Sequence, residues 1–178
     1  MMHKSLAACF LLLCGTGVVA QSPYADEQGR QIKALSTERI AGLKAGRGLG
    51  YAKAAELNGY PGPKHVLELA DDLDLDADQL RRTEALHETM LESAGALGRD
   101  LVAVEAELEE TFAEASMSRE HLVELVSRSS RIEGRIRLIH LQAHLEQLEL
   151  LDDEQVTEYM RLRGYGQKAS DDHHQHRH

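Results

Sequence analysis

Residues 76–112, DADQLRRTEALHETMLESAGALGRDLVAVEAELEETF, and residues 118–150, SREHLVELVSRSSRIEGRIRLIHLQAHLEQLEL, decide the fold of this chain. In both stretches apolar or small residues recur at spacings of three and four, which is the pattern of one buried face of an α-helix. The pattern predicts two long helices. Because the connection between them is short, the two helices must run antiparallel. We therefore expect an all-α fold built on a long antiparallel helical hairpin.

Short helices are expected on both sides of this hairpin. Ser36 is a good N-cap for a helix over 36–45, and a second short helix is predicted over 49–57. Pro63 suits the first turn of a third helix, and a last short helix is predicted to begin at Asp152 and to close at Gly164. The predicted helical domain therefore spans residues 36–164.

The two ends of the chain do not have the pattern of a fold. Residues 1–20 have a basic start, an apolar run and a small-residue end, so we expect a signal peptide that is cleaved after Ala20 and a periplasmic location. Residues 21–35 are polar and without a period, which predicts a flexible arm. Residues 165–178 are predicted to be a disordered, histidine-rich tail.

The composition excludes several classes of function. The chain has 20 Lys and Arg residues against 30 Asp and Glu residues, a net charge of −10, and lacks a basic patch, so we expect no binding to nucleic acid. No nucleophile with a matching base stands out, so we expect a protein that is not an enzyme. Gly46, Gly48 and Gly50 follow a predicted helix rather than a strand, and we expect no organic cofactor.

One short pattern occurs twice, each time where a helix is expected to begin. Leu75-Asp76-Ala77-Asp78-Gln79 and Leu151-Asp152-Asp153-Glu154-Gln155 share a leucine, a capping residue and a glutamine at fixed spacing. Asp is a strong N-cap residue, and Gln at the third helical position completes a capping box. The predicted motif residues are Asp76, Gln79, Asp152 and Gln155.

This repeated pattern resembles the L-T-x-x-Q motif of the periplasmic Spy/CpxP family, which includes zinc-resistance-associated and CnrX-like heavy-metal-sensor proteins. Asp stands here where the family usually has Thr, and it keeps the capping oxygen. Further stretches that are similar to an alphaproteobacterial branch of the family are AKAAELNGYPGP at 52–63, HLQAHL at 140–145 and LRGYG at 162–166. The resemblance covers residues 35–166.

The resemblance implies a non-catalytic helical hairpin in the periplasm that is often a homodimer. Some family members bind unfolded client proteins without ATP. Others bind Zn, Ni, Co or Cu and report to a membrane-bound signalling partner. The leading hypothesis is therefore a stress protein of the Spy/CpxP type that acts as a chaperone, binds metal, or does both. The alternative is a heavy-metal sensor or regulatory subunit.

The histidines of the second long helix suggest a metal site. His140 and His144 are four residues apart, which brings both imidazoles to one face of a helix. In an antiparallel hairpin His144 falls level with Glu88 and beside His87. The predicted ligands are therefore His87, Glu88, His140 and His144, for a divalent transition metal ion (Zn, Cu, Ni or Co). The alternative is that His87 is a polar core residue while the other two histidines are solvated.

Four further histidines lie in the C-terminal tail: His173, His174, His176 and His178. Tracts of this kind chelate Zn, Ni or Cu without folding. The alternative is a solubilising tail whose positive charge rises as the pH falls through the usual histidine range.

A second apolar stripe runs along the second long helix, opposite the face expected to pack on the first. It consists of Leu138, Leu141, Leu145 and Leu148. An apolar face needs a cover. We predict client or dimer contact here, although the short N-terminal helices are a further candidate cover.

Overall fold

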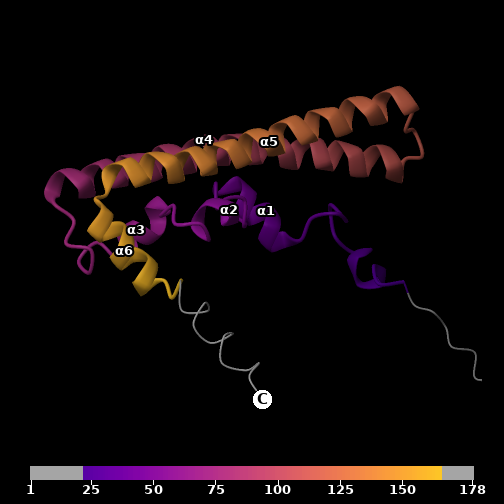
Figure 1. Ribbon diagram of the computed structural model, residues 1–178. Coiled ribbons are helices and arrows are strands. Elements are labelled where there is room, and N and C mark those ends of the chain that lie inside the picture. Colours follow the sequence, from indigo (N-terminus) through magenta and orange to yellow (C-terminus); the bar gives the residue numbers. More distant parts are fainter. Residues whose placement is uncertain (1–21, 166–178) are drawn as a thin grey trace, which may run out of the picture.

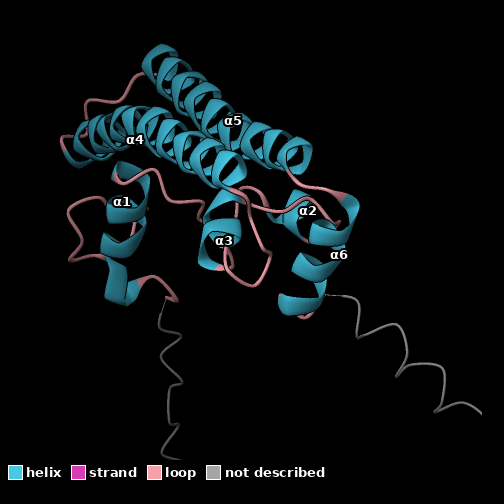
Figure 2. Cartoon of the chain, turned by 90° about the vertical axis from the view of Figure 1, so that its left-hand side faces the viewer, coloured by secondary structure: helices cyan, strands magenta, loops and turns pink. Residues whose placement is uncertain are grey.

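The computed structural model describes residues 22–165 and shows an all-helical architecture over that range (Figure 1). Two long helices, α4 (Ala77–Ala113) and α5 (Arg119–Leu150), pack along each other in opposite directions. Four short helices gather on one side of this long pair (Figure 2). They are α1 (Thr37–Lys44), α2 (Lys53–Glu56), α3 (Pro63–Glu68) and α6 (Asp153–Leu162). The predicted all-α class is confirmed.

Side-chain caps fix where the helices begin. Ser36 and Ser118 each accept a hydrogen bond from the backbone of the third helical residue of α1 and α5. Asp76 and Asp152 form full capping boxes at the starts of α4 and α6. These caps satisfy backbone N–H groups that have no partner inside the helix. Most helix starts were therefore predictable to within a residue.

The two copies of the repeated motif meet in space. The Gln79 side-chain amide donates to Gln155 Oε1 at 2.8 Å, and the Gln155 amide donates back to Gln79 Oε1 at 3.0 Å. Each glutamine also donates to a backbone carbonyl of the other arm, Leu150 for Gln79 and Leu73 for Gln155. The motif thus ties the start of α4 to the start of α6, beside the end of α5.

The short N-terminal helices approach the long pair very closely. A side chain at Gly98 of α4 would place its Cβ 2.0 Å from the carbonyl oxygen of Leu43 in α1. Gly46, with φ +67°, would meet the backbone of Leu91 in the same way. Glycine at these positions lets two backbones come into contact. Leu43 is therefore buried in a cluster with Leu101 and other apolar side chains.

The segment that precedes α1 differs in part from the predicted flexible arm. It contains a single 3-10 turn at Ala25–Glu27, yet Ile32 and Leu35 are buried in the main apolar cluster. Lys33 forms an ion pair with Glu109 of α4. The end of the predicted arm therefore packs on the long helix pair. Two apolar residues spaced by three are too short a pattern to predict this contact from the sequence.

The second short helix is also shorter than predicted. The sequence suggested residues 49–57, but only Lys53–Glu56 is helical. Leu49 and Gly50 have φ values of +44° and +85°, which interrupt any helix. The predicted signal peptide, residues 1–20, lies outside the described residues, as does the predicted tail except for Tyr165. Within the described range, no helix has the length and apolar character of a membrane span.

Candidate functional site

The short helices and their connections enclose a cavity of about 740 Å³ against the long pair. Four histidines line it, and we call it the histidine cavity: His65 of α3, His87 of α4, and His140 and His144 of α5. Because α1–α3 pack against α4 and α5, side chains distant in sequence converge here. Two of the four predicted metal ligands, His140 and His144, form its buried floor.

His144 is held in one orientation by the backbone. Its Nδ1 lies 2.8 Å from the carbonyl oxygen of Tyr60. A carbonyl oxygen can only accept, so Nδ1 carries the proton and, in the neutral ring, Nε2 has a lone pair. Nε2 faces Gly62, where an added Cβ would lie 2.9 Å from it. This arrangement, with one ring nitrogen bonded to a carbonyl, is the one that orients metal-binding histidines.

His140 is the more deeply buried of the pair, with 2% of its surface exposed. Its ring stacks on Tyr51, with the centroids 6.1 Å apart and the planes inclined by 12°. Its Nε2 is buried and has no hydrogen-bond partner among the described residues. Burial, and then the neighbouring His144, lower the pKa of His140. The imidazole is therefore neutral at pH 7, which is the form that binds metals.

His87 and Glu88 have different positions relative to the cavity. His87 is half-buried and lines it, and burial followed by the charge of Lys64 lowers the pKa of His87. Glu88 is exposed and lies outside the cavity lining. The antiparallel register predicted that Glu88 lies level with His144. Because Glu88 follows His87 by one residue, its side chain lies on another face of α4.

Glu56 of α2 is a cavity residue that sequence reasoning missed. Its Oε1 accepts hydrogen bonds from the hydroxyl of Tyr159 at 2.7 Å and of Tyr165 at 3.1 Å, and from Arg163 Nε at 3.2 Å. Its Oε2 is buried without a hydrogen bond in the described structure and lies 3.8 Å from His144 Nδ1. The Glu56 carboxylate therefore joins α6 to the cavity floor.

The histidine cavity has donor atoms for a metal ion but not a completed ligand set. Within residues 22–165, no three His, Cys, Asp or Glu side chains stand close enough together to hold an ion. Two buried atoms in the cavity, His140 Nε2 and Glu56 Oε2, nevertheless lack a partner in this range. Buried polar groups are normally paired, so these two atoms are candidates for ligand contact. The four tail histidines lie outside the described residues.

The predicted leucine stripe is only partly uncovered. Leu138 and Leu145 are 53% and 51% exposed, whereas Leu141 and Leu148 are half-buried. The two exposed leucines form a small apolar strip on the outer side of α5. This strip and the histidine cavity are separate features of the same helix.

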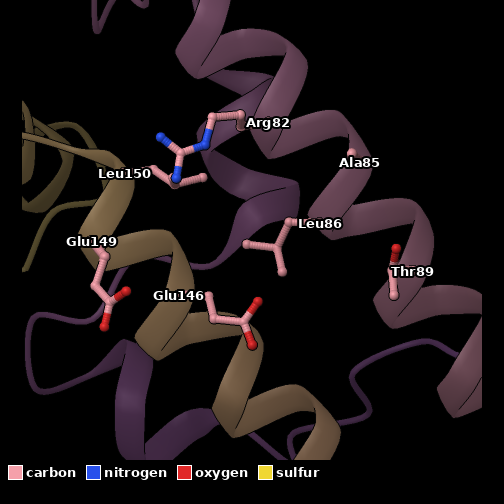
Figure 3. A pocket seen from close by; sticks show the side chains of 7 residues that line it. All are labelled: Arg82, Ala85, Leu86, Thr89, Glu146, Glu149 and Leu150. Carbon is pink, nitrogen blue, oxygen red and sulfur yellow. The ribbon is translucent and has the colours of Figure 1, made fainter.

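A second, smaller cavity of about 410 Å³ lies between α4 and α5 (Figure 3). Leu86 and Leu150 form its apolar part, and Arg82 and Glu146 extend along its edges. None of the described residues that line it is a histidine. Of these two cavities, only the histidine cavity bears on the metal hypothesis.

Comparison with known proteins does not identify this chain. No protein-family model matches it. No curated protein and no solved structure matches it either. The fold and the site thus define an all-helical protein in which a long helix pair and short covering helices enclose a histidine-lined cavity, and its function is inferred from that geometry.

Proposed function

We propose that this chain is a periplasmic, non-enzymatic stress protein of the Spy/CpxP type whose histidine cavity binds a divalent transition metal ion. The observation that carries the proposal is the imidazole pair on the cavity floor. His140 presents a buried, unpartnered Nε2, and His144 is oriented by Tyr60 so that its Nε2 is the acceptor nitrogen. Imidazole nitrogen suits Zn, Cu, Ni and Co.

Physical cost supports the same proposal. A buried polar atom without a partner costs roughly 1–3 kcal/mol. The cavity lining contains two such atoms, His140 Nε2 and Glu56 Oε2, and Glu56 Oε2 lies 3.8 Å from His144 Nδ1. A bound cation that contacts either atom compensates part of this cost. His87 lines the same cavity with a half-buried imidazole and is a further candidate ligand.

The finer architecture belongs to the same proposal. We infer that the long helix pair acts as a rigid hairpin and that two copies form a homodimer. The exposed Leu138 and Leu145 support this, because an apolar strip on a helix exterior is a natural contact surface. Sedimentation velocity of the wild-type chain and of a Leu138→Gln/Leu145→Gln variant tests it, with a dimer expected only for the wild type.

The test of metal binding is calorimetric titration of Zn(II), Cu(II), Ni(II) and Co(II) into the full chain with His173, His174, His176 and His178 replaced by Asn. This removes the tail as a competing chelator. We expect submicromolar binding of one ion per chain for at least one metal. The absence of binding by all four metals refutes the proposal.

Two single substitutions test whether the metal ion binds at the floor of the histidine cavity. His140→Phe keeps the ring that stacks on Tyr51 but removes the nitrogens. Gly62→Ala places a methyl group against His144 Nε2 while both histidines remain. Each is expected to weaken metal binding by about tenfold or more. Gly134→Ala, in open space on α5, is the matched control and should bind as the parent does.

Client binding is the second candidate function, and the exposed strip of Leu138 and Leu145 favours it. We expect the metal-free chain to suppress aggregation of a chemically unfolded model protein without ATP. Leu138→Gln/Leu145→Gln should abolish this, whereas His140→Phe should leave it intact. Loss of suppression in His140→Phe alone would assign client binding to the cavity instead of the leucine strip.

The regulatory alternative is supported by Glu56, which joins the cavity to α6. A sensor must change its surface when metal binds, whereas a store need not. Hydrogen exchange of α6 with and without Zn(II) separates the two. A change in α6 protection supports a signal to a membrane-bound partner, and unchanged protection supports storage or client binding.

A further inference from the structure

The histidine cavity is much larger than a metal ion requires. Its volume of about 740 Å³ lies in the range of small-molecule sites, which is roughly 300–1,000 Å³. Leu49, Met90 and Leu91 contribute apolar side chains to its lining. A metal ion at the floor therefore leaves room for a second, organic component above it.

The opening of the cavity is cationic although the whole chain is acidic. The side chains at the opening, which we call the cationic rim, are Arg47, Lys53 and Lys64, and all three are exposed. Lys64 pairs with Glu68 at 3.4 Å, whereas the described residues give Arg47 and Lys53 no ion-pair partner. Arg39 also lines the cavity but is paired with Glu133 at 3.1 Å.

The rim charges suit an anion. Four cationic side chains line the cavity, and two of them, Arg39 and Lys64, are paired with Glu133 and Glu68, which leaves Arg47 and Lys53 as the cations that have no ion-pair partner among the described residues. Unpaired cations beside a cleft raise the local concentration of anions. The floor, by contrast, presents imidazole nitrogens, which are metal ligands. A ligand that satisfies both parts must offer metal to the floor and negative charge to the rim.

The ligand set points in the same direction. Metal ions of this class take four to six ligands, and the imidazoles of His140 and His144 are the candidate protein ligands at the buried floor. No complete set of three ligating side chains is assembled in the described part of the chain. Oxygen atoms of a bound chelator can occupy the remaining positions.

We propose that the histidine cavity takes the metal ion as a chelate with a small organic carboxylate that has an apolar body. This inference rests on the proposed metal-binding function. His140 and His144 contact the ion, Arg47 and Lys53 contact carboxylate oxygens of the chelator, and Leu49 and Met90 pack on its carbon body. The chain is then a carrier or sensor of a metal complex.

The experiment is equilibrium dialysis of the full chain, with its four tail histidines replaced by Asn, against dipicolinate with and without Zn(II). Dipicolinate is an aromatic dicarboxylate that chelates Zn(II). Isophthalate is the matched probe because it has the same shape and charge but lacks the ring nitrogen and does not chelate. We expect dipicolinate to be retained, one molecule per chain, only when Zn(II) is present, and isophthalate not to be retained.

The rim variant Arg47→Gln/Lys53→Gln tests the anion contacts. It should weaken retention of the zinc–dipicolinate complex by about tenfold while changing the affinity for Zn(II) alone by less than about twofold. Lys44→Gln/Arg137→Gln, which removes two exposed cations outside the cavity lining, is the matched control and should retain the complex as the parent does.

Three results overturn the inference. The first is retention of isophthalate or of metal-free dipicolinate, which indicates a site for anions in general. The second is failure of the parent chain to retain the zinc–dipicolinate complex. The third is a rim variant that retains this complex as well as the parent does. Titration with the four metal ions alone distinguishes these failures from failure of the proposed function. If one of these ions binds alone but the zinc complex does not, only the chelate inference fails. If no metal ion binds, with or without dipicolinate, both fail.

Discussion

Tyr159→Phe tests whether the Glu56 carboxylate is the structural link between α6 and the cavity. Tyr159 is fully buried, and its hydroxyl donates to Glu56 Oε1 at 2.7 Å. The same hydroxyl accepts a longer bond from the backbone N–H of Gly62 at 3.4 Å. Phenylalanine retains the ring, and with it the packing against Val66 and Leu73, so the change removes only the hydroxyl.

The expected loss can be worked from these contacts. A hydrogen bond to a charged group contributes roughly 1.5–3 kcal/mol, and the 3.4 Å contact adds little. Glu56 Oε1 keeps its bonds from Arg163 and Tyr165, so the carboxylate is not left without partners. For a domain of this size each kcal/mol shifts Tm by about 2–4 °C, which gives a fall of roughly 3–12 °C.

The assay is urea unfolding followed by far-UV circular dichroism, a signal that this helical chain supplies strongly. Tyr165→Phe is the matched control, because its hydroxyl contacts the same oxygen from a less buried position at 3.1 Å, and its loss should be smaller. A double-mutant cycle with Glu56→Gln isolates the pair. The reasoning is refuted if Tyr159→Phe loses less than about 0.5 kcal/mol, or if it loses as much in the Glu56→Gln background.

Three further predictions concern the frame around the site. Gly98→Ala should cost about 3 kcal/mol in urea unfolding because its Cβ meets the α1 backbone, whereas Gly134→Ala, in open space, should gain about 0.5–1 kcal/mol. Burial and the charge of Glu133 raise the pKa of Glu105, so Glu105→Gln should raise Tm at pH 7, a gain that scanning calorimetry should find lost below about pH 4. Gln79→Ala should cost about 2 kcal/mol, because it breaks a capping box and the contact between the two motif copies, and an unchanged urea midpoint would contradict this.

Much of the fold could be predicted because its signals are local. A helix start depends on one capping side chain and the next three residues, so Asp76, Ser118 and Asp152 marked their helices directly. The period of three and four then fixed which face of each long helix is buried. Two parts departed from the local pattern: residues around 46–57, where positive φ values break the helix, and the end of the predicted arm, where Ile32 and Leu35 are buried.

The site was harder to predict because the segments that cover its histidines have no regular repeat of apolar residues. The four-residue spacing of His140 and His144 placed both on one face, but that face appeared to be the edge of the apolar stripe. Its cover is residues 46–63, which contact it through turns and through Gly62. Both histidines are therefore buried, and the alternative of two solvated rings is wrong. Glu56 was missed because its partners on Oε1 follow about one hundred residues later, in and after α6.

Substitutions that remove buried polar atoms without partners can distinguish a binding site from an imperfectly packed core. Gln147 Oε1 is also buried without a partner in residues 22–165, but Gln147 does not line the histidine cavity. If His140 is retained for a ligand, removing its nitrogens should stabilise the metal-free chain while abolishing metal binding, a conflict typical of functional sites. We expect His140→Phe to gain on the order of 1 kcal/mol in urea and to lose Zn(II) binding, because stacking on Tyr51 is kept. Gln147→Met removes the unpartnered Oε1, which stabilises the chain, but it also removes the hydrogen bond that Gln147 donates to Thr83, which destabilises it. The two effects should nearly cancel, and the variant should bind Zn(II) normally. Loss of stability in His140→Phe would instead make this histidine a structural residue of the core.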